Sequence, residues 1–418
     1  MSRLPLRSGF HVARRIGVRL LVGVVASQVA VAAALVVTDA VKKKDRVKRF
    51  GFPHPGSFDA TVGDTATTLY TLGEDLYRDM LAAIRGARHQ ILFETYLWKA
   101  DEVGREFRDA LNDAAARGVD VYIIYDWFGN LVVPRSFYRF HPAVHVFRFP
   151  PVRLSLLLSP LRAAGLTHRK LLVVDSEFAF VGGYNIGSLY ATEWRDTHVR
   201  LSGPAIFELA HSFAQVWNHL SSRDTPGLSP HNPSPWNPPL RAINNIPADL
   251  VYPIRAVYLD AISRAQTHIH LTTAYFIPDQ QILTALIEAA RRGVDVQIMI
   301  PEESNHVVAD WLSRGFYSAL LSEDITLLLY RNAMIHAKTA SIDGHWSIVG
   351  TANIDRLSLG FNYETVLEVQ DSAFAANMER IFQADSDNCR RVTREEWSTR
   401  HPAARAAETA LTPLRTML

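Results

Sequence analysis

The sequence contains very little cysteine, with Cys389 as the only one among 418 residues. A lone thiol cannot form a disulfide within the chain, and it excludes a zinc site built mainly from cysteine ligands. A reducing compartment is compatible with this composition. Apolar residues make up 48% of the chain, an ordinary share for a globular protein. The length allows two domain-sized cores or one two-lobed domain.

Most of the chain also lacks an excess of positive charge. Residues 1–50 hold eleven of the 44 lysines and arginines but only two acidic residues, which gives this segment a formal charge of +9. The rest of the chain carries a net charge of −7. An acidic body binds nucleic acid poorly, because phosphate backbones are held by basic side chains. We therefore expect no nucleic-acid partner, and we expect the basic end to face another anionic surface.

The N-terminal segment contains one long apolar run, Leu20 to Val37, without a charged residue. As a helix it would span about 27 Å, close to the hydrocarbon thickness of a bilayer. Basic residues flank it on both sides, which leaves its orientation open and would hold the chain against anionic headgroups. We expect a retained single-pass anchor, a transmembrane helix over about residues 16–38. A cleaved signal peptide and a buried helix are the alternatives.

One pattern of polar residues occurs twice, and the rest of the chain is organised around it. A histidine and a lysine two residues apart are followed by an aspartate, a Gly-(Gly/Thr)-x-Asn sequence and a further carboxylate, and the copies are offset by 168 positions. The matched residues are His168, Lys170, Asp175, Gly182, Gly183, Asn185 and Asp196 in the first copy, and His336, Lys338, Asp343, Gly350, Thr351, Asn353 and Glu364 in the second. Chance would not keep these positions in register, so we infer two structural repeats that each supply half of one active site.

The spacing indicates how one copy presents its polar groups. Histidine and lysine two residues apart on a strand point to the same face. In the second copy, Asp343-Gly344 is a strong signal for a two-residue hairpin. Folding the chain there would place Thr351 opposite His336, with Asn353 one diagonal step away. Two such patches facing each other would surround one anion, which suits phosphodiester chemistry: one imidazole attacks phosphorus and the other protonates the leaving oxygen.

The remaining pattern predicts alternating strands and helices, typical of layered α/β folds. Aspartates that can cap helices and glycines that can close them recur in both halves. The expected elements in the first half are strands at 66–71, 90–98 and 119–125 and helices at 74–85 and 101–117. In the second half, residues 265–276 correspond to 87–98, and a helix at 280–292 and a strand at 294–300 follow. The expected domains are a basic N-terminal anchor (1–50), a first repeat (51–225), a Pro-rich linker (226–248), a second repeat (249–392) and a C-terminal tail (393–418).

The doubled His-x-Lys-x4-Asp motif, each copy followed by Gly-(Gly/Thr)-x-Asn, resembles the phospholipase D superfamily. Three further stretches, Trp194 to His198, Thr273 to Pro278 and Asp355 to Glu364, are similar to its bacterial cardiolipin synthase branch. The resemblance covers roughly residues 66–390. It implies an α/β fold in which two α/β/α repeats pack as a pseudo-dimer within one chain. It also implies a reaction that needs no metal and no other cofactor.

The resemblance also implies roles for single residues. His168 is expected to form a phosphohistidine, with His336 acting as acid and then as base, although the sequence itself also allows the reverse. Lys170 and Lys338 are expected to be pocket-facing cations in the catalytic set. Their alternative is a pair of solvated surface charges.

The other matched residues have supporting roles. The phosphate-binding candidates are Asn185, Asn353 and Thr351. Asp175 and Asp343 complete the catalytic motif, and we expect them to act as structural supports, because turn chemistry alone explains an aspartate at those positions.

Carboxylates outside the core motif are also candidates. Asp196 and Glu364 each lie 28 residues after their histidine and are expected to orient an imidazole by a hydrogen bond. Glu94 and Tyr96 have no counterpart in the second repeat and are expected to shape one side of the pocket.

Two further segments have an open interpretation. His268-Ile269-His270 has the spacing of a two-histidine metal pair, but no third ligand is evident and we expect no metal there. Residues 147–166 mix leucines with Arg153 and Arg162 and lead into the first motif. This segment fits either core packing or a basic apolar ledge that admits lipid from the membrane interface.

These expectations describe a membrane-anchored enzyme of a bacterial inner membrane, with its catalytic body on the cytoplasmic side. The resemblance implies that a phosphatidyl group passes from phosphatidylglycerol to the hydroxyl of a second phosphatidylglycerol, giving cardiolipin and glycerol. The residues alone equally allow hydrolysis, as in a phospholipase D or a nuclease, but the acidic body and the anchor count against a nuclease. A catalytically silent lipid-binding scaffold is the third alternative, and the intact motifs count against it.

Overall fold

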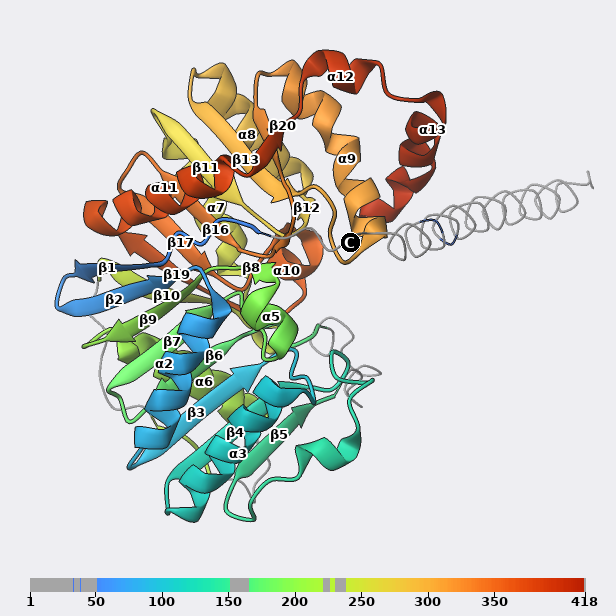
Figure 1. Ribbon diagram of the computed structural model, residues 1–418. Helices are drawn as coiled ribbons and strands as arrows, with labels where there is room; N and C mark the ends of the chain where they lie inside the picture. Colours follow the sequence, from blue (N-terminus) through green and yellow to red (C-terminus); the bar gives the residue numbers. More distant parts are fainter. Residues whose placement is uncertain are drawn as a thin grey trace, which may run out of the picture.

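The computed structural model describes residues 33, 38, 51–150, 165–220, 226–229 and 238–416. These residues contain two eight-stranded sheets, one in each half of the chain (Figure 1). The first, in the order β1-β2-β9-β7-β6-β3-β4-β5, consists of β1 (Ser57–Val62), β2 (Thr65–Tyr70), β3 (Gln90–Thr95), β4 (Asp120–Asp126), β5 (His145–Phe149), β6 (Leu171–Val174), β7 (Phe178–Gly182) and β9 (His198–Ser202). The second, in the order β10-β19-β17-β16-β11-β13-β14-β20, consists of β10 (Leu240–Asn245), β11 (His268–Thr272), β13 (Asp295–Pro301), β14 (Thr326–Tyr330), β16 (Thr339–Ile342), β17 (Trp346–Gly350), β19 (Glu364–Gln370) and β20 (Cys389–Arg391).

Helices and short strands complete each half. The first half has α2 (Gly73–Gly86), α3 (Glu102–Ala116), α5 (Ser188–Thr192), α6 (Ile206–Leu220), the 3₁₀ turn η1 (Arg135–Tyr138) and the short strand β8 (Trp194–Arg195). The second half has α7 (Pro253–Arg264), α8 (Gln280–Arg291), α9 (Val307–Ser322), α10 (Arg356–Gly360), α11 (Ser372–Ser386), α12 (Arg394–Ser398), α13 (Pro402–Leu411), the 3₁₀ turns η3 (Pro247–Asp249) and η4 (Thr412–Thr416), and the short strands β12 (Phe276–Ile277), β15 (Met334–Ile335) and β18 (Ile354–Asp355).

The two sheets share one topology. In the first, β3 pairs in parallel with β4 and antiparallel with β6, which continues through β7 to β9. In the second, β11 pairs in parallel with β13 and antiparallel with β16, which continues through β17 to β19. The prediction of a repeated α/β fold is therefore confirmed.

The three largest clusters of buried apolar side chains form layers of core. One lies between the first sheet and α2 and α3, and a second lies between the second sheet and α7, α8 and α9. A third core joins the halves: it contains residues of β7, β9, β17 and β19 together with the apolar faces of α6 and α11. Helix α11 reaches back to β1 of the first sheet, beside which it lies in Figure 1. The two halves therefore share a core and pack against each other, rather than forming two separate domains joined only by a linker.

The predicted helix starts follow their capping residues. The Asp101 carboxylate accepts a hydrogen bond from the Gly104 N–H at the start of α3. Asp279 accepts from the N–H groups of Gln281 and Ile282 at the start of α8. Each cap satisfies N–H donors that have no partner inside the helix. The paired helices therefore begin at equivalent places in the two repeats.

The hairpin of the second motif differs from the prediction. Ile342 pairs with Trp346, so the loop holds three residues rather than two, and its first two, Asp343 and Gly344, have φ of 54° and 64°. The extra residue shifts the register by one position and brings the Gly350 N–H to the Lys338 carbonyl. The predicted placement of Thr351 opposite His336 is therefore wrong. The first motif makes the same three-residue loop, with Val174 paired to Phe178.

Asp175 and Asp343 fasten these loops to the central strands. Each carboxylate accepts hydrogen bonds from three consecutive backbone N–H groups, and each lies at the opposite end of its strand from the motif lysine. The donors are Arg88, His89 and Gln90 for Asp175, and Gln266, Thr267 and His268 for Asp343. The geometry is that of a structural support and leaves both carboxylates outside the reacting groups.

Among residues 51–150, 165–220, 226–229 and 238–416, no helix combines the length and the apolar character needed to cross a bilayer. The predicted anchor over residues 16–38 lies outside the described residues except for Ala33 and Thr38. The ledge predicted over 147–166 likewise falls mostly on residues 151–164, which the structure does not describe.

Replacement of Asp343 tests its supporting role. Burial alone would raise the pKa of this carboxyl, but the hydrogen bonds from backbone N–H groups outweigh burial and lower the pKa. Asp343→Ala removes these bonds and disfavours the left-handed backbone, so we expect it to cost about 2–3 kcal/mol. Asp343→Asn tolerates the backbone and keeps one acceptor, and should cost roughly half as much. Thermal unfolding measures both changes, with His345→Ala in the same loop as the control.

The pH dependence separates charge from turn geometry. Because the folded pKa is lowered, the stabilisation is complete above the unfolded pKa of about 3.9 and is lost as pH falls through the folded value. The Tm difference between the natural protein and Asp343→Asn should therefore shrink below about pH 4. A difference that stays constant down to pH 3 would contradict this role.

Candidate active site

Backbone pairing between the repeats positions both motif histidines. Short strand β8 of the first half pairs in parallel with β15 of the second, and the His336 N–H donates to the Arg195 carbonyl at 2.7 Å. At the related place, Thr167 pairs with Tyr363, and the His168 N–H donates to the Tyr363 carbonyl at 3.0 Å. β8 accordingly lies among elements of the second half in Figure 1. Each histidine is thus attached to the backbone of the opposite repeat.

The carboxylates that orient the imidazoles are also exchanged. His168 Nδ1 lies 3.0 Å from a Glu364 carboxylate oxygen, and His336 Nδ1 lies 2.7 Å from an Asp196 oxygen. A carboxylate only accepts, so Nδ1 carries the hydrogen and Nε2 presents its lone pair on the other side of the ring. Both carboxylates therefore have the predicted kind of role, but each serves the histidine of the other repeat.

Both imidazoles are neutral at neutral pH. Burial lowers the pKa of His168, which Glu364 partly offsets by favouring the charged form. Burial also lowers the pKa of His336 well below its ordinary value, and the positive charges of Lys338 and Lys170 lower it further. Neutral rings have the free lone pair that a nucleophile or a base requires.

The motif lysines lie next to the imidazoles. The Lys170 ammonium donates to the His168 carbonyl at 2.6 Å, and the Lys338 ammonium donates to the His336 carbonyl. Burial lowers the pKa of Lys170 to about 7 and that of Lys338 to about 8. Each lysine also feels the carboxylates Glu364 and Asp196, which favour its charged form. An anion entering here would meet two desolvated cations, whose attraction is strong in a low dielectric.

The predicted phosphate-binding residues divide into two kinds. Asn185 and Asn353 are buried beside the two motifs: Asn185 Oδ1 accepts the Leu97 N–H at 3.2 Å, and Asn353 Oδ1 has no hydrogen-bond partner among the described residues. The Thr351 hydroxyl instead donates to Glu364 and accepts the Thr365 N–H at 3.0 Å. Thr351 therefore supports the carboxylate behind His168 and is not available to a phosphate.

In the first repeat, the position that matches Thr351 is Gly183, and the Asp196 carboxylate occupies the space where a side chain would lie. A Cβ atom placed on Gly183 would lie 2.0 Å from an Asp196 carboxylate oxygen. Glycine is therefore required because Asp196 occupies the volume that a side chain would need. The two repeats hold their carboxylates by different means.

Aromatic rings form part of the wall. The Tyr96 ring meets the His168 ring edge-on, with centroids 4.9 Å apart, and Lys170 Nζ lies 5.3 Å from the Tyr96 centroid. The Trp194 ring lies 4.9 Å from that of His336. Tyr96 thus lies against His168 and Lys170, and Trp194 takes the corresponding place near the other imidazole.

Glu94, in contrast, is buried and contacts the residues on either side of His168 rather than the imidazole. Its carboxylate accepts the Thr167 hydroxyl at 2.5 Å and lies 3.5 Å from the guanidinium of Arg169, which is fully buried. Arg169 also donates to the hydroxyls of Thr365 and Ser212, and so connects the two repeats. Sequence reasoning missed Arg169, although the contrast with Ala337 at the same motif position was a usable signal.

Two further buried acids near the motifs were also missed. Asp126, at the end of β4, accepts the Thr167 N–H at 3.2 Å and the Gly129 N–H at 2.8 Å. Asp385 of α11 forms a buried ion pair with Arg195 at 2.7 Å, which fixes the strand that carries the His336 partner. Their identification required knowledge of which distant segments meet.

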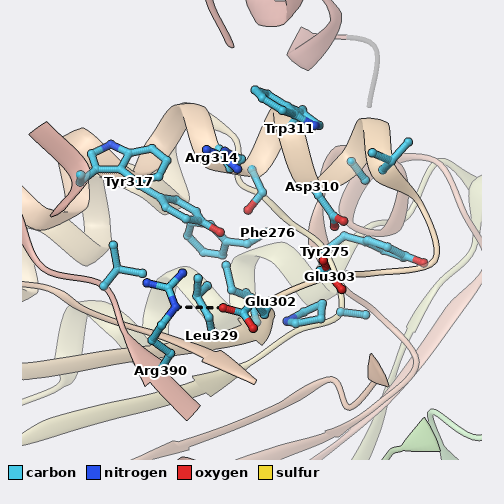
Figure 2. A pocket seen from close by; sticks show the side chains of 18 of the residues that line it. Tyr275, Phe276, Glu302, Glu303, Asp310, Trp311, Arg314, Tyr317, Leu329 and Arg390 are labelled. Atoms are coloured by element: carbon cyan, nitrogen blue, oxygen red, sulfur yellow. Dashed lines mark hydrogen bonds and ion pairs between the residues drawn. The ribbon is translucent and has the colours of Figure 1, made fainter. Parts of the chain in front are cut away.

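A separate cavity of about 550 Å³ lies along α9 (Figure 2). Its wall combines carboxylates, arginines and aromatic rings, and Glu302 is paired with Arg390 at 2.9 Å. The labelled lining residues are Tyr275, Phe276, Glu302, Glu303, Asp310, Trp311, Arg314, Tyr317, Leu329 and Arg390. Neither motif histidine nor motif lysine lines it, so the phosphate chemistry is assigned to the motif cluster.

Comparison with known proteins agrees with this geometry. The chain matches the family described as "Cardiolipin synthase, PLD-like domain" over residues 80–217 and 258–386. It is 33% identical over 349 residues to the major cardiolipin synthase ClsA of Bacillus subtilis (strain 168), covering 81% of this chain and 72% of that protein. It is 31% identical over 338 residues to cardiolipin synthase A of Pseudomonas putida, covering 79% of this chain and 70% of that protein.

Among solved structures, phosphatidylserine synthase of Haemophilus influenzae Rd KW20 shares the fold, with a TM-score of 0.64 and 14% identity over 84% of this chain and 93% of that one. Both halves of the chain match the family, and the curated relatives extend across most of its length. The chain therefore belongs to the cardiolipin synthase family of phospholipase D-like proteins.

Proposed function

We propose that this protein is a phosphatidyltransferase that makes cardiolipin and glycerol from two molecules of phosphatidylglycerol. The observation that carries the proposal is the exchanged pair of imidazoles: each Nδ1 is held by a carboxylate of the other repeat, and a buried lysine lies next to each histidine. Family membership and the relatives named cardiolipin synthases support the choice of lipid.

The reaction divides into two displacements at one phosphorus atom. His168 Nε2 attacks the phosphodiester of the first lipid, forming an N–P bond while the bond from phosphorus to the headgroup glycerol oxygen breaks. His336 gives a proton to that oxygen, and glycerol leaves. His336 then takes the proton from the headgroup hydroxyl of a second phosphatidylglycerol, whose oxygen attacks phosphorus and releases His168.

The lysines and amides serve the charge that develops on phosphorus. Lys170 and Lys338 stabilise the pentacoordinate state, and Asn185 and Asn353 donate from their side-chain amides. The entering phosphate is itself an anion that favours protonated neighbours, so its binding raises the pKa of the surrounding imidazoles. This allows His336 to carry the proton that it delivers to the leaving oxygen.

Transfer at a lipid phosphate requires that the site face a membrane. The predicted N-terminal anchor and the basic residues after it would provide attachment to an inner membrane whose headgroups are anionic, with the catalytic body on the cytoplasmic side. The division that we propose keeps the anchor, the first repeat over 51–225 and the tail. The predicted linker over 226–248 is too long, because β10 (Leu240–Asn245) pairs with β19, so the second repeat begins by residue 240 and runs to 392.

The loop after β4 supports a membrane-facing rim next to the site. Phe128, Leu131 and Val132 are 52%, 54% and 84% exposed. Between them, Asn130 donates its side-chain amide to the carbonyl of Tyr96 at 2.7 Å, and the Tyr96 ring contacts that of His168. Three solvent-exposed apolar side chains on one short loop favour insertion of that loop into the lipid interface.

The lipid products test the proposed reaction. Full-length protein in detergent, mixed with phosphatidylglycerol vesicles and a chelator, should produce cardiolipin and glycerol by mass spectrometry. His168→Ala should abolish the product. Glu364→Gln, in the opposite repeat, should lower kcat by about 10²–10⁴-fold, because a neutral amide neither fixes the tautomer of the imidazole nor stabilises the positive charge that the ring gains. A His336→Ala protein should accumulate lipid phosphate on His168.

Other products decide between the remaining alternatives. Phosphatidic acid without cardiolipin would show a hydrolase, and no turnover by any preparation would indicate a scaffold. Trapped phosphate on His336 in the His168→Ala protein would reverse the two roles. Asp175→Asn is the control, since this carboxylate is outside the site and should affect stability more than kcat.

The lysines predict an alkaline loss of activity. A lysine is charged below its pKa, so the free enzyme loses positive charge as pH rises through about 7 for Lys170 and about 8 for Lys338. We expect kcat/KM, which reports the free enzyme, to fall over this range, with a later fall in kcat because bound phosphate raises both pKa values. Lys170→Arg stays charged and should remove the lower transition. An unchanged bend in its kcat/KM profile would exclude Lys170 as the titrating group.

The exposed loop predicts a surface-specific defect. Replacement of Phe128 and Leu131 by Asp should lower activity on phosphatidylglycerol vesicles about tenfold or more, since each buried apolar side chain contributes about 1.5–3 kcal/mol. Activity on a monomeric short-chain phosphatidylglycerol should be unchanged. Leu250→Asp, at a similarly exposed leucine elsewhere (45% exposed), is the control. Equal loss on both substrates would show that the loop shapes the site rather than binds the membrane.

A further inference from the structure

A second cluster of histidines and a carboxylate lies away from the active site. His268 and His270 point to the same face of β11, and Glu379 projects from α11 toward them. One donor atom from each of the three residues lies within 4.8 Å of the others. The cluster is at the Asp343 end of the second repeat, separated from Lys338 by the length of β16. Helix α11 thus supplies the third ligand that the sequence alone did not reveal.

The hydrogen bonds around His268 fix where its lone pair points. The Thr267 hydroxyl has one hydrogen, which it donates to the Asp343 carboxylate at 2.8 Å. It therefore accepts from His268 Nδ1, 3.0 Å away, and Nδ1 carries the ring hydrogen. In the neutral ring, Nε2 then presents a lone pair to a Glu379 oxygen at 2.6 Å. Two lone pairs at this distance repel each other unless a positive charge lies between or on them.

The neighbouring His270 has a ring nitrogen, Nδ1, that is buried and without a hydrogen-bond partner among the described residues. Its ring stacks on Phe382 with centroids 4.4 Å apart and planes within 2°, so its orientation is set by packing. Glu379 and Phe382 are one turn apart on α11, so this helix positions both a ligand and the ring that holds another.

We propose that His268, His270 and Glu379 bind a divalent transition-metal ion of the zinc class. Two imidazoles and one carboxylate are ligands that zinc prefers, and water would complete a tetrahedron. Donors around such an ion are about 3.3 Å apart. The donor pairs that now lie within 4.8 Å of one another would therefore close toward this distance, whereas Glu379 would withdraw from His268 by roughly 0.7 Å. Its side chain is 30% exposed and can make this movement. The chain from Asp343 through Thr267 to His268 is an outer shell that fixes the imidazole.

The ion would fasten α11 to the central strand of the second sheet. The same helix reaches the first repeat: Asn377 donates to the Asp59 carbonyl at 3.0 Å, and Asp385 pairs with Arg195 beside the strand that holds His336. The ion would take no part in phosphoryl transfer. Its role is to hold the helix that joins the repeats, and its binding is independent of catalysis.

Metal titration of the tag-free, full-length protein in detergent tests the site. Cobalt(II) should give the visible absorption of a tetrahedral ion at one equivalent per chain, and zinc should displace it. His270→Ala should abolish this signal, and Glu379→Gln, which can still hydrogen-bond to His268, should weaken affinity at least tenfold. Thr267→Val should weaken it by about 10–100-fold as an outer-shell change. Zinc should raise the Tm of the natural protein but not that of His270→Ala.

Two control variants exclude other histidines. His168→Ala removes an imidazole of the active site, and His219→Ala removes one from an isolated pair with Asp249. Both should bind cobalt as the natural protein does. Failure of the natural protein to bind would overturn the proposal and leave an imidazolium–carboxylate ion pair. Binding that persists in His270→Ala and Glu379→Gln, or that is lost in His168→Ala, would place the metal elsewhere and also overturn it.

Discussion

The exchange of carboxylates between the repeats is the interaction on which the rest of the structure depends. His168 is oriented by Glu364, and His336 by Asp196, so neither repeat by itself holds an oriented imidazole. The same exchange occurs in the backbone, where each histidine N–H is bound by a carbonyl of the other half. A displacement of one repeat against the other by an ångström would break these bonds together. The shared apolar core and the α11 contacts can therefore be understood as the means of keeping this register.

Burying the titratable side chains of both motifs costs free energy of desolvation, and the lowered pKa values of these groups limit that cost. The imidazoles are neutral, and the pKa values of Lys170 and Lys338 are lowered to about 7 and 8, so the empty site holds less charge than its composition suggests. Desolvation penalises an unpaired charge by several kcal/mol. An entering phosphate supplies the missing counter-charge, so the free energy gained on binding is greatest for the ligand that the site is proposed to transform. The same residues therefore provide selectivity and catalysis.

Features that depend on local sequence pattern could be predicted. The register of the hairpins and the contacts between distant segments could not. The order of the predicted strands and helices and the caps at Asp101 and Asp279 follow from local sequence pattern, and the structure contains them. The hairpin register was off by one position because a three-residue loop replaces the two-residue turn that Asp-Gly favours. Asp196 and Glu364 each follow the histidine of their own repeat by the same number of residues. Sequence spacing therefore could not reveal that each carboxylate contacts the histidine of the other repeat. Buried partners such as Asp385 become apparent only when distant segments are brought together.

The two halves of the site have diverged, and this divergence supports a division of labour. His168 has a side chain 13% exposed and contacts Tyr96, whereas His336 is 6% exposed and lies beside Trp194. A residue that carries a lipid phosphate between two displacements must be reached by both lipids, which favours the more accessible imidazole as the nucleophile. Burial lowers the pKa of His336, so this imidazole binds a proton only when the anionic phosphate is present. It then gives that proton up readily to the leaving oxygen. The deeper His336 therefore has the environment of an acid and base, and the asymmetry between two related repeats becomes the basis for two different roles at one phosphorus atom.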